Sequence, residues 1–137
     1  MKARILNSPE ARTIIAVTQK APETFIESVG KKSAEVMVCP EADNRVDLNY
    51  LVRKLGEMGI DSILIEAGGE LNFSALRQGI VDKVYAFIAA KIIGGKTANT
   101  PMGGAGFEKI SEAVDLNITG IEKFKNDILI EAYMMGK

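Results

Sequence analysis

The chain has 137 residues, 47% of them hydrophobic, with 17 basic and 18 acidic side chains and a formal net charge of -1. The length fits a single domain over residues 1–137, and the charge balance gives no electrostatic reason to expect nucleic acid or a membrane as partner. The absence of histidine excludes His-based triads and His-containing zinc sites, and we expect no metal. A single cysteine, Cys39, and an N-terminus without a signal-peptide pattern favour the cytoplasm.

The first half of the chain alternates strand and helix patterns. Short β-branched or apolar runs predict strands over residues 13–18 and 34–39, with a short helix over 23–29 between them. A longer helix is predicted over 47–58, where apolar residues recur at three- and four-residue steps. Asp47 is its expected N-cap, and a glycine follows its last turn.

The second half begins with a predicted buried strand over residues 62–66. A sharp turn then leads into a helix over 71–78, and a long strand is expected over 81–90. The Gly-, Thr-, Asn- and Pro-rich residues 96–106 are expected to form a loop. Two closing strands are predicted, over residues 113–121 and 127–134.

This element order predicts an α/β fold. Strand–helix alternation implies parallel β-α-β units, whereas the short link between the closing strands implies an antiparallel hairpin. We therefore expect one mixed, mostly parallel sheet flanked by helices, with an antiparallel C-terminal hairpin.

The turn between the strand over 62–66 and the next helix contains the glycine pair Gly68 and Gly69. Unpaired amides at a helix N-terminus favour an anion, and glycines let a diphosphate approach the backbone. A Gly-Gly pair is also an ordinary tight turn, and this one lacks the G-x-G-x-x-G pattern of Rossmann folds. Glu70 has a second reading too, as a first-turn acid that complements the helix dipole.

The run from Asp61 to Val84 resembles the reductase domain of the bifunctional deaminase/reductases of riboflavin biosynthesis. That family has a strand ending in Glu-Gly-Gly, a helix beginning Leu-Asn and a Gly-Leu-Val-Asp-like junction; this chain has Ala67 at the first glycine. Further similar segments lie in order along the chain, at residues 90–96, 104–107 and 127–130.

The resemblance implies a dihydrofolate-reductase-like fold, NADPH as cofactor and an oxidoreductase activity. The implied reaction reduces the ribosyl group of a 5-amino-6-(5-phosphoribosylamino)pyrimidine, in its uracil or 2-amino pyrimidinone form, to ribityl. It also implies a role for each of several residues. Glu66 would face the substrate, Thr18 and Lys20 would contact the 2′-phosphate of the cofactor, and the diphosphate would lie on Gly68, Gly69 and the amides of Glu70 and Leu71.

Other readings stay open. The family's domain normally begins before the point that matches Met1, so the resemblance implies that this chain is the C-terminal part of a reductase domain, N-terminally truncated. The alternatives are a reductase of the same fold for a pterin- or folate-like substrate, and a non-catalytic fragment that keeps the fold and a dimer interface. A homodimer is expected, because family members are commonly dimers.

Overall fold

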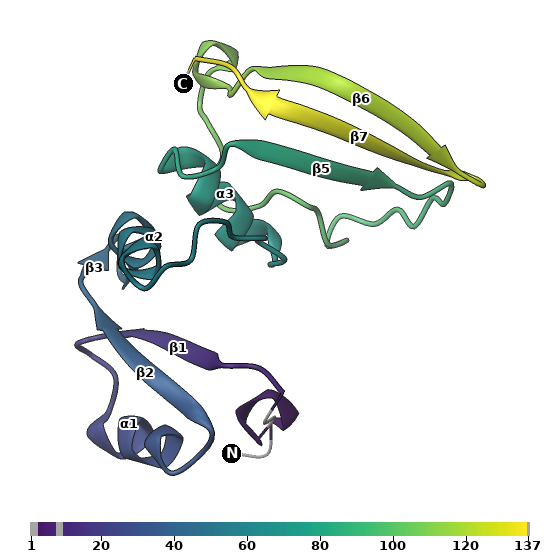
Figure 1. Ribbon diagram of the computed structural model, residues 1–137. Coiled ribbons are helices and arrows are strands. Elements are labelled where there is room, and N and C mark those ends of the chain that lie inside the picture. The colour runs from purple at the N-terminus through teal and green to yellow at the C-terminus, as the bar shows by residue number, and fades with distance from the viewer. Residues whose placement is uncertain (1–2, 8–9, 137) are drawn as a thin grey trace. The chain divides into compact units, whose positions relative to one another are not determined.

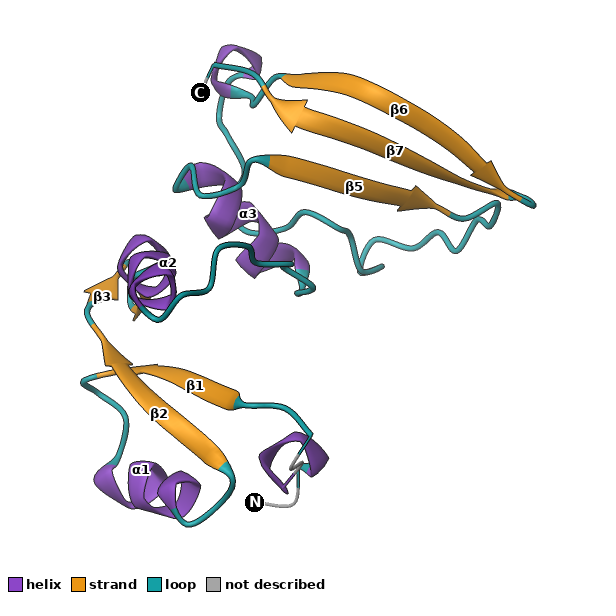
Figure 2. Ribbon diagram, viewed as in Figure 1, coloured by secondary structure: helices purple, strands orange, loops and turns teal. Residues whose placement is uncertain are grey.

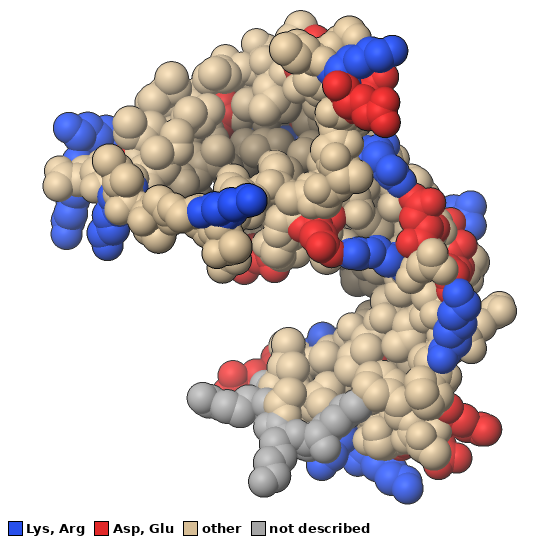
Figure 3. Space-filling model, turned by 180° about the vertical axis from the view of Figure 1, so that it is seen from behind, with Lys and Arg blue, Asp and Glu red and all other residues tan. Residues whose placement is uncertain are grey.

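The computed structural model describes residues 3–7 and 10–136 of the chain. Its contacts divide the chain into two units, Met1–Ser62 and Ile63–Lys137, and each unit has its own sheet and helices. The face shown in Figure 3 carries both basic and acidic side chains. Among the described residues, no helix combines the length and apolarity that crossing a bilayer requires.

The first unit is built on a parallel strand pair. After a short 3₁₀ helix, η1 (Arg4–Asn7), strand β1 (Thr13–Thr18) pairs in parallel with β2 (Ala34–Cys39), and helix α1 (Glu23–Gly30) connects them. This confirms the first predicted β-α-β unit. Its small core contains Leu6, Val29 and Ala34, with Ile15, Phe25 and Val36 packed against them.

A hairpin that the sequence analysis did not predict follows β2. Strands β3 (Glu41–Ala42) and β4 (Arg45–Val46) pair antiparallel around Asp43 and Asn44, whose φ angles are 51° and 59°. Positive φ at both central residues is the geometry of a type I′ turn, which Asp and Asn tolerate better than most residues.

Helix α2 (Leu48–Glu57) confirms the strongest helical pattern in the sequence. The side chain of Asp47 caps it by accepting a hydrogen bond from the Tyr50 amide at 3.0 Å, as predicted. Gly59 follows the helix with φ of 83°, a conformation that only glycine adopts without strain.

The second unit contains helix α3 (Gly69–Arg77) and a three-stranded antiparallel sheet (Figure 2). Strand β7 (Asp127–Met134) lies in the centre, with β5 (Lys83–Ile88) on one side and β6 (Leu116–Phe124) on the other. A long loop with one short 3₁₀ helix, η2 (Ile110–Glu112), connects β5 to β6.

A polar contact across the sheet ties β5 to β7. The Lys83 ammonium donates to the Glu131 carboxylate at 2.7 Å and lies 4.5 Å from the centre of the Tyr133 ring. The hydrogen bond to Glu131 is the largest of the effects that raise the pKa of Lys83. Both side chains are partly shielded from solvent, which favours a fixed geometry over a fluctuating surface pair.

The predicted antiparallel hairpin is confirmed, but β6 begins and ends three residues later than predicted. Residues 122–124, which were expected to be a polar link, are part of the strand: Glu122 pairs with Leu129 and Phe124 with Asp127. An edge strand such as β6 tolerates exposed charged side chains. The turn is consequently short, and Lys125 adopts a φ of 56° within it.

The predicted strand over residues 62–66 is wrong. These residues form no strand, and Ile63 and Leu64 are 44% and 74% exposed. A strand needs a hydrogen-bonded neighbour, and none of the described residues provides one for this segment. For the same reason the described strands form three separate sheets rather than the single mixed sheet that we expected.

Candidate functional site

The glycine turn leads directly into α3, which begins two residues earlier than predicted. Gly68 is the N-cap, with φ of -74° and ψ of 161°, and its carbonyl accepts hydrogen bonds from the amides of Leu71 and Asn72, both at 3.1 Å. The Leu71 amide, which we expected to donate to a diphosphate, is therefore engaged within the helix. Glu70 lies in the first turn, where an acid complements the helix dipole.

The loop after β5 returns to this turn and lies against Gly69. The Gly103 amide donates to the Gly69 carbonyl at 3.0 Å. A Cβ added at Gly69 would lie 2.8 Å from both the Gly103 nitrogen and the Thr100 carbonyl oxygen. Backbone atoms this close cannot give way cheaply, so Gly69 is required by the loop that packs on it.

Gly68 has a different environment. Apart from its neighbours in the chain, no atom of the described residues would lie within 4 Å of a Cβ added there, and the residue is exposed with an ordinary negative φ. The internal structure therefore does not require glycine at this position. A glycine that leaves open space beside a helix N-terminus suits the close approach of an anionic ligand such as a diphosphate.

Glu66 lies two residues before Gly68 and its side chain is exposed. Among the described residues, no hydrogen bond or ion pair reaches its carboxylate. A structural role for Glu66 as the acid of a salt bridge therefore has no partner in the part of the chain that the structure describes. The carboxylate is available to a ligand beside the glycine turn.

Thr18 and Lys20 lie in the first unit, at the end of β1. The Thr18 hydroxyl accepts a hydrogen bond from the Lys20 amide at 3.3 Å, which closes a small polar turn. The Lys20 ammonium pairs with the Glu41 carboxylate at 2.6 Å, and the lysine side chain is 69% exposed. This places a hydroxyl and a cation on one turn, as predicted, with the cation already engaged by an acid.

The seven predicted site residues thus fall into two groups. Glu66, Gly68, Gly69, Glu70 and Leu71 lie together on one turn of the second unit, and Thr18 and Lys20 lie together on one turn of the first. Among the described residues, no cluster of three or more His, Cys, Asp or Glu side chains could hold a metal ion.

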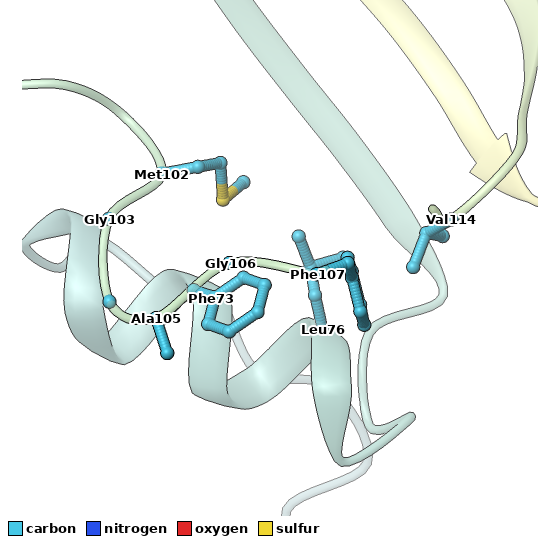
Figure 4. A pocket seen from close by; sticks show the side chains of 9 residues that line it. Phe73, Leu76, Met102, Gly103, Ala105, Gly106, Phe107 and Val114 are labelled. Atoms are coloured by element: carbon cyan, nitrogen blue, oxygen red, sulfur yellow. The ribbon is translucent and has the colours of Figure 1, made fainter. Parts of the chain in front are cut away.

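An apolar pocket of about 410 Å³ lies between α3 and the loop that packs on it (Figure 4). The rings of Phe73 and Phe107 meet edge to face at 5.1 Å, and Met102 points toward the pocket from the loop. No local pattern predicts this approach, because it joins segments about 30 residues apart in the chain. The complete lining is Phe73, Leu76, Met102, Gly103, Gly104, Ala105, Gly106, Phe107 and Val114.

Comparison with known families shows which family has this sequence pattern. Residues 1–130 match the family described as RibD C-terminal domain. The chain belongs to the RibD C-terminal domain family. The resemblance seen in the sequence is thereby confirmed, and the match includes both glycine-turn and polar-turn residues.

Curated members of the family and related reductases align over most of the chain. The riboflavin biosynthesis protein RibD of Actinobacillus pleuropneumoniae is 44% identical over 127 residues, which are 93% of this chain and 34% of that protein. The 2,5-diamino-6-ribosylamino-4(3H)-pyrimidinone 5′-phosphate reductase of Methanothermobacter thermautotrophicus is 36% identical over 97% of this chain and 60% of that protein. The chain thus spans about a third to three fifths of these relatives.

Solved structures related to the RibD C-terminal domain support the fold. Acinetobacter baumannii RibD superposes with a TM-score of 0.75 and 20% identity, over 98% of this chain and 34% of that one. A pyrimidine reductase-like protein from Corynebacterium diphtheriae gives a TM-score of 0.72 at 22% identity, over 90% of this chain and half of that one. These similarities confirm the predicted mixed α/β, dihydrofolate-reductase-like fold class.

Proposed function

We propose that this chain carries the cofactor-binding turn of an NADPH-dependent reductase of riboflavin biosynthesis. The reaction is the reduction of the ribosyl group of a 5-amino-6-(5-phosphoribosylamino)pyrimidine to ribityl. One observation supports this most directly. Gly68 is exposed with open space beside it at the start of α3, and the unpaired carboxylate of Glu66 lies two residues away.

Each of the two turns is assigned to one part of the dinucleotide on its own chemistry. The diphosphate would lie on the open side of Gly68, near the positive end of the α3 dipole. Lys20 and Thr18 would contact the adenosine 2′-phosphate, where a cation and a hydroxyl can each give a charge-assisted hydrogen bond. Lys20 would exchange its ion pair with Glu41 for this contact, and the contact favours NADPH over NADH because only NADPH carries the 2′-phosphate.

When bound, NADPH supplies the hydride that reduces the former anomeric carbon of the ring-opened sugar. The chain's own contribution is orientation and charge. Glu66 would orient the pyrimidine or ribosyl part of the substrate, since a carboxylate accepts hydrogen bonds from ring N–H and sugar hydroxyl groups. No covalent intermediate with the protein is needed.

Two substrate forms are chemically suitable. Relatives that share 36% and 35% identity are named for a 2,5-diamino pyrimidinone phosphate, whereas the RibD relative is named only for its pathway. Oxidation of NADPH by the chain should be measured with the 2-amino pyrimidinone and the uracil forms side by side. Oxidation with either form would support the proposal, and a preference would identify the substrate. Oxidation with a pterin or dihydrofolate instead would support the alternative reductase.

We also propose that the two units are parts of one reductase domain that forms homodimers in the cytoplasm. The family match spans both units, which supports a single domain. Large apolar side chains on the sheet, including Phe87 at 72% and Ile121 at 66% exposure, favour a partner there. Sedimentation should give the mass of two chains, and a monomer at micromolar concentration would contradict the dimer.

A further inference from the structure

The side chain of Asn72 connects two segments that are distant in sequence. Its Nδ2 donates to the Ala67 carbonyl at 3.3 Å and to the Pro101 carbonyl at 3.0 Å. Both partners are carbonyl oxygens, so only the amide nitrogen of asparagine can make the two contacts. Asn72 is half-buried near the start of α3, which limits competition from water for the contact to Ala67, whereas the contact to Pro101 is exposed.

The loop that Asn72 reaches has few other polar contacts. Gly104 lies close to the Phe73 ring, but Pro101 and Met102 are exposed, so apolar burial contributes little to fixing the backbone at those two residues. Besides Asn72, the Gly103 amide holds the loop by donating to the Gly69 carbonyl at 3.0 Å. The Thr100 hydroxyl donates to the Met102 carbonyl at 2.5 Å and stiffens the loop internally.

These contacts fix the glycine turn from two directions. Asn72 holds the carbonyl of Ala67 just before the turn, and Gly103 holds the carbonyl of Gly69 just after Gly68. Gly68 is thereby left open while both of its neighbours are held. A turn whose flanking carbonyls are fixed before a ligand arrives loses less conformational freedom on binding.

We infer that Asn72 is a positioning residue, which fixes the loop over residues 100–104 against the glycine turn and thereby increases the affinity of that turn for a dinucleotide diphosphate. This inference rests on the proposed function. Asn72 itself contacts two backbone carbonyls and acts on the ligand only through Ala67 and the loop.

The test compares Asn72→Ala and Asn72→Leu with the unaltered 137-residue chain. Leucine keeps the branching of asparagine at Cγ and removes the donors without adding charge, and the smaller alanine controls for its greater volume. Ser74→Ala is the matched control, because the Ser74 hydroxyl donates at 2.9 Å to the Glu70 carbonyl within α3 and does not reach the loop. Two quantities are measured: hydrogen exchange of the Gly103 amide by NMR, and the dissociation constant for NADPH by calorimetry.

Both Asn72 variants should exchange the Gly103 amide about tenfold faster, while amides of the β5–β7 ladder keep their protection. Their dissociation constants for NADPH should rise about tenfold, and Ser74→Ala should match the unaltered chain in both measurements. A purely structural role would instead lower the protection of the β5–β7 amides together with that of Gly103.

If the Gly103 amide exchanges at an unchanged rate in both Asn72 variants, the inference is overturned, whether or not the dissociation constant for NADPH changes. Faster exchange with an unchanged dissociation constant would also overturn it, because the loop would then not affect the turn. Failure of the unaltered chain to bind NADPH would contradict the proposed function itself, and that outcome is separable because the exchange measurement needs no ligand.

Discussion

The Gly103 amide donates a hydrogen bond to the carbonyl of Gly69 at 3.0 Å, and a Cβ at Gly69 would lie 2.8 Å from the same nitrogen. One glycine of the pair is thus required by a loop that packs on it. The other, Gly68, has no atom within 4 Å of an added Cβ and remains open to a ligand. The two adjacent glycines therefore have different roles, and substitutions at each should have different consequences.

We predict that Gly69→Ala lowers the free energy of unfolding by about 1–3 kcal/mol, because its Cβ would overlap the backbone of the loop. Gly68→Ala should lower it by less, about 0.5 kcal/mol for the replacement of a glycine N-cap by alanine, since the added Cβ meets open space at an ordinary φ. Urea denaturation followed by circular dichroism measures both. Equal stabilities of the two variants would contradict the close approach of the loop.

Lys20→Ala should weaken NADPH binding about fivefold to tenfold and leave NADH binding unchanged, because only NADPH carries the 2′-phosphate. Lys54→Ala is the matched control. Lys54 is also in an ion pair, with Glu57 at 2.6 Å, but belongs to α2 and not to the polar turn of Thr18. If the two lysine variants have the same ratio of NADPH to NADH affinity, the assignment of Lys20 to the 2′-phosphate is wrong.

Glu66→Gln should lower kcat/KM for the phosphoribosylamino-pyrimidine about tenfold to a hundredfold, because the amide keeps the shape of the carboxylate and loses its charge. NADPH affinity should stay within about twofold, since the exposed carboxylate is assigned to the substrate. Asp61→Asn, which neutralises another exposed acid of the preceding segment, is the control. If Glu66→Gln has the same steady-state kinetics as the unaltered chain, the assignment of Glu66 to the substrate is wrong.

A pH dependence is expected from the pair of Arg12 and Glu35. The guanidinium donates two hydrogen bonds to the carboxylate, at 2.7 and 2.8 Å, and they lower the pKa of Glu35 below its ordinary value of 4.5. Because the pKa of Glu35 is lower in the folded state, the pair stabilises the fold at pH values above the ordinary pKa of the carboxylate. This stabilisation is lost as the pH falls through the folded-state pKa.

Glu35→Gln should therefore lower the thermal midpoint at pH 7, and the difference from the unaltered chain should shrink as the pH falls below 4.5. The effect should be small, because both side chains are more than half exposed. Glu27→Gln, on the exposed face of α1, serves as the control. A difference in thermal midpoint that grows as the pH falls would contradict the stabilising role assigned to this ion pair.

Elements specified by neighbouring residues could be predicted from the sequence. The bounds of β1 and β2 were predicted correctly from their short β-branched or apolar runs. Helix α2 was predicted because Asp47 provides its cap and its apolar residues repeat with helical period. The β6–β7 hairpin was predicted because its strands adjoin in the chain.

Features that depend on distant partners could not be predicted in this way. An apolar run such as residues 62–66 has the composition of a strand, but pairing with a neighbour decides whether one forms. In the site, the sequence identifies Gly68 and Gly69 without distinguishing them. The difference arises from Thr100 and Gly103, which no local pattern connects to the turn.

The most direct test of the proposed cofactor site is calorimetric titration of the 137-residue chain with NADPH and with NADH, repeated for Gly68→Val. We predict that the unaltered chain binds NADPH at least about tenfold more tightly than NADH, and that a valine side chain in the open space beside Gly68 abolishes this binding while the chain stays folded. Binding of neither dinucleotide by the unaltered chain, or equal NADPH affinity in Gly68→Val, would contradict the assignment of the glycine turn to the cofactor.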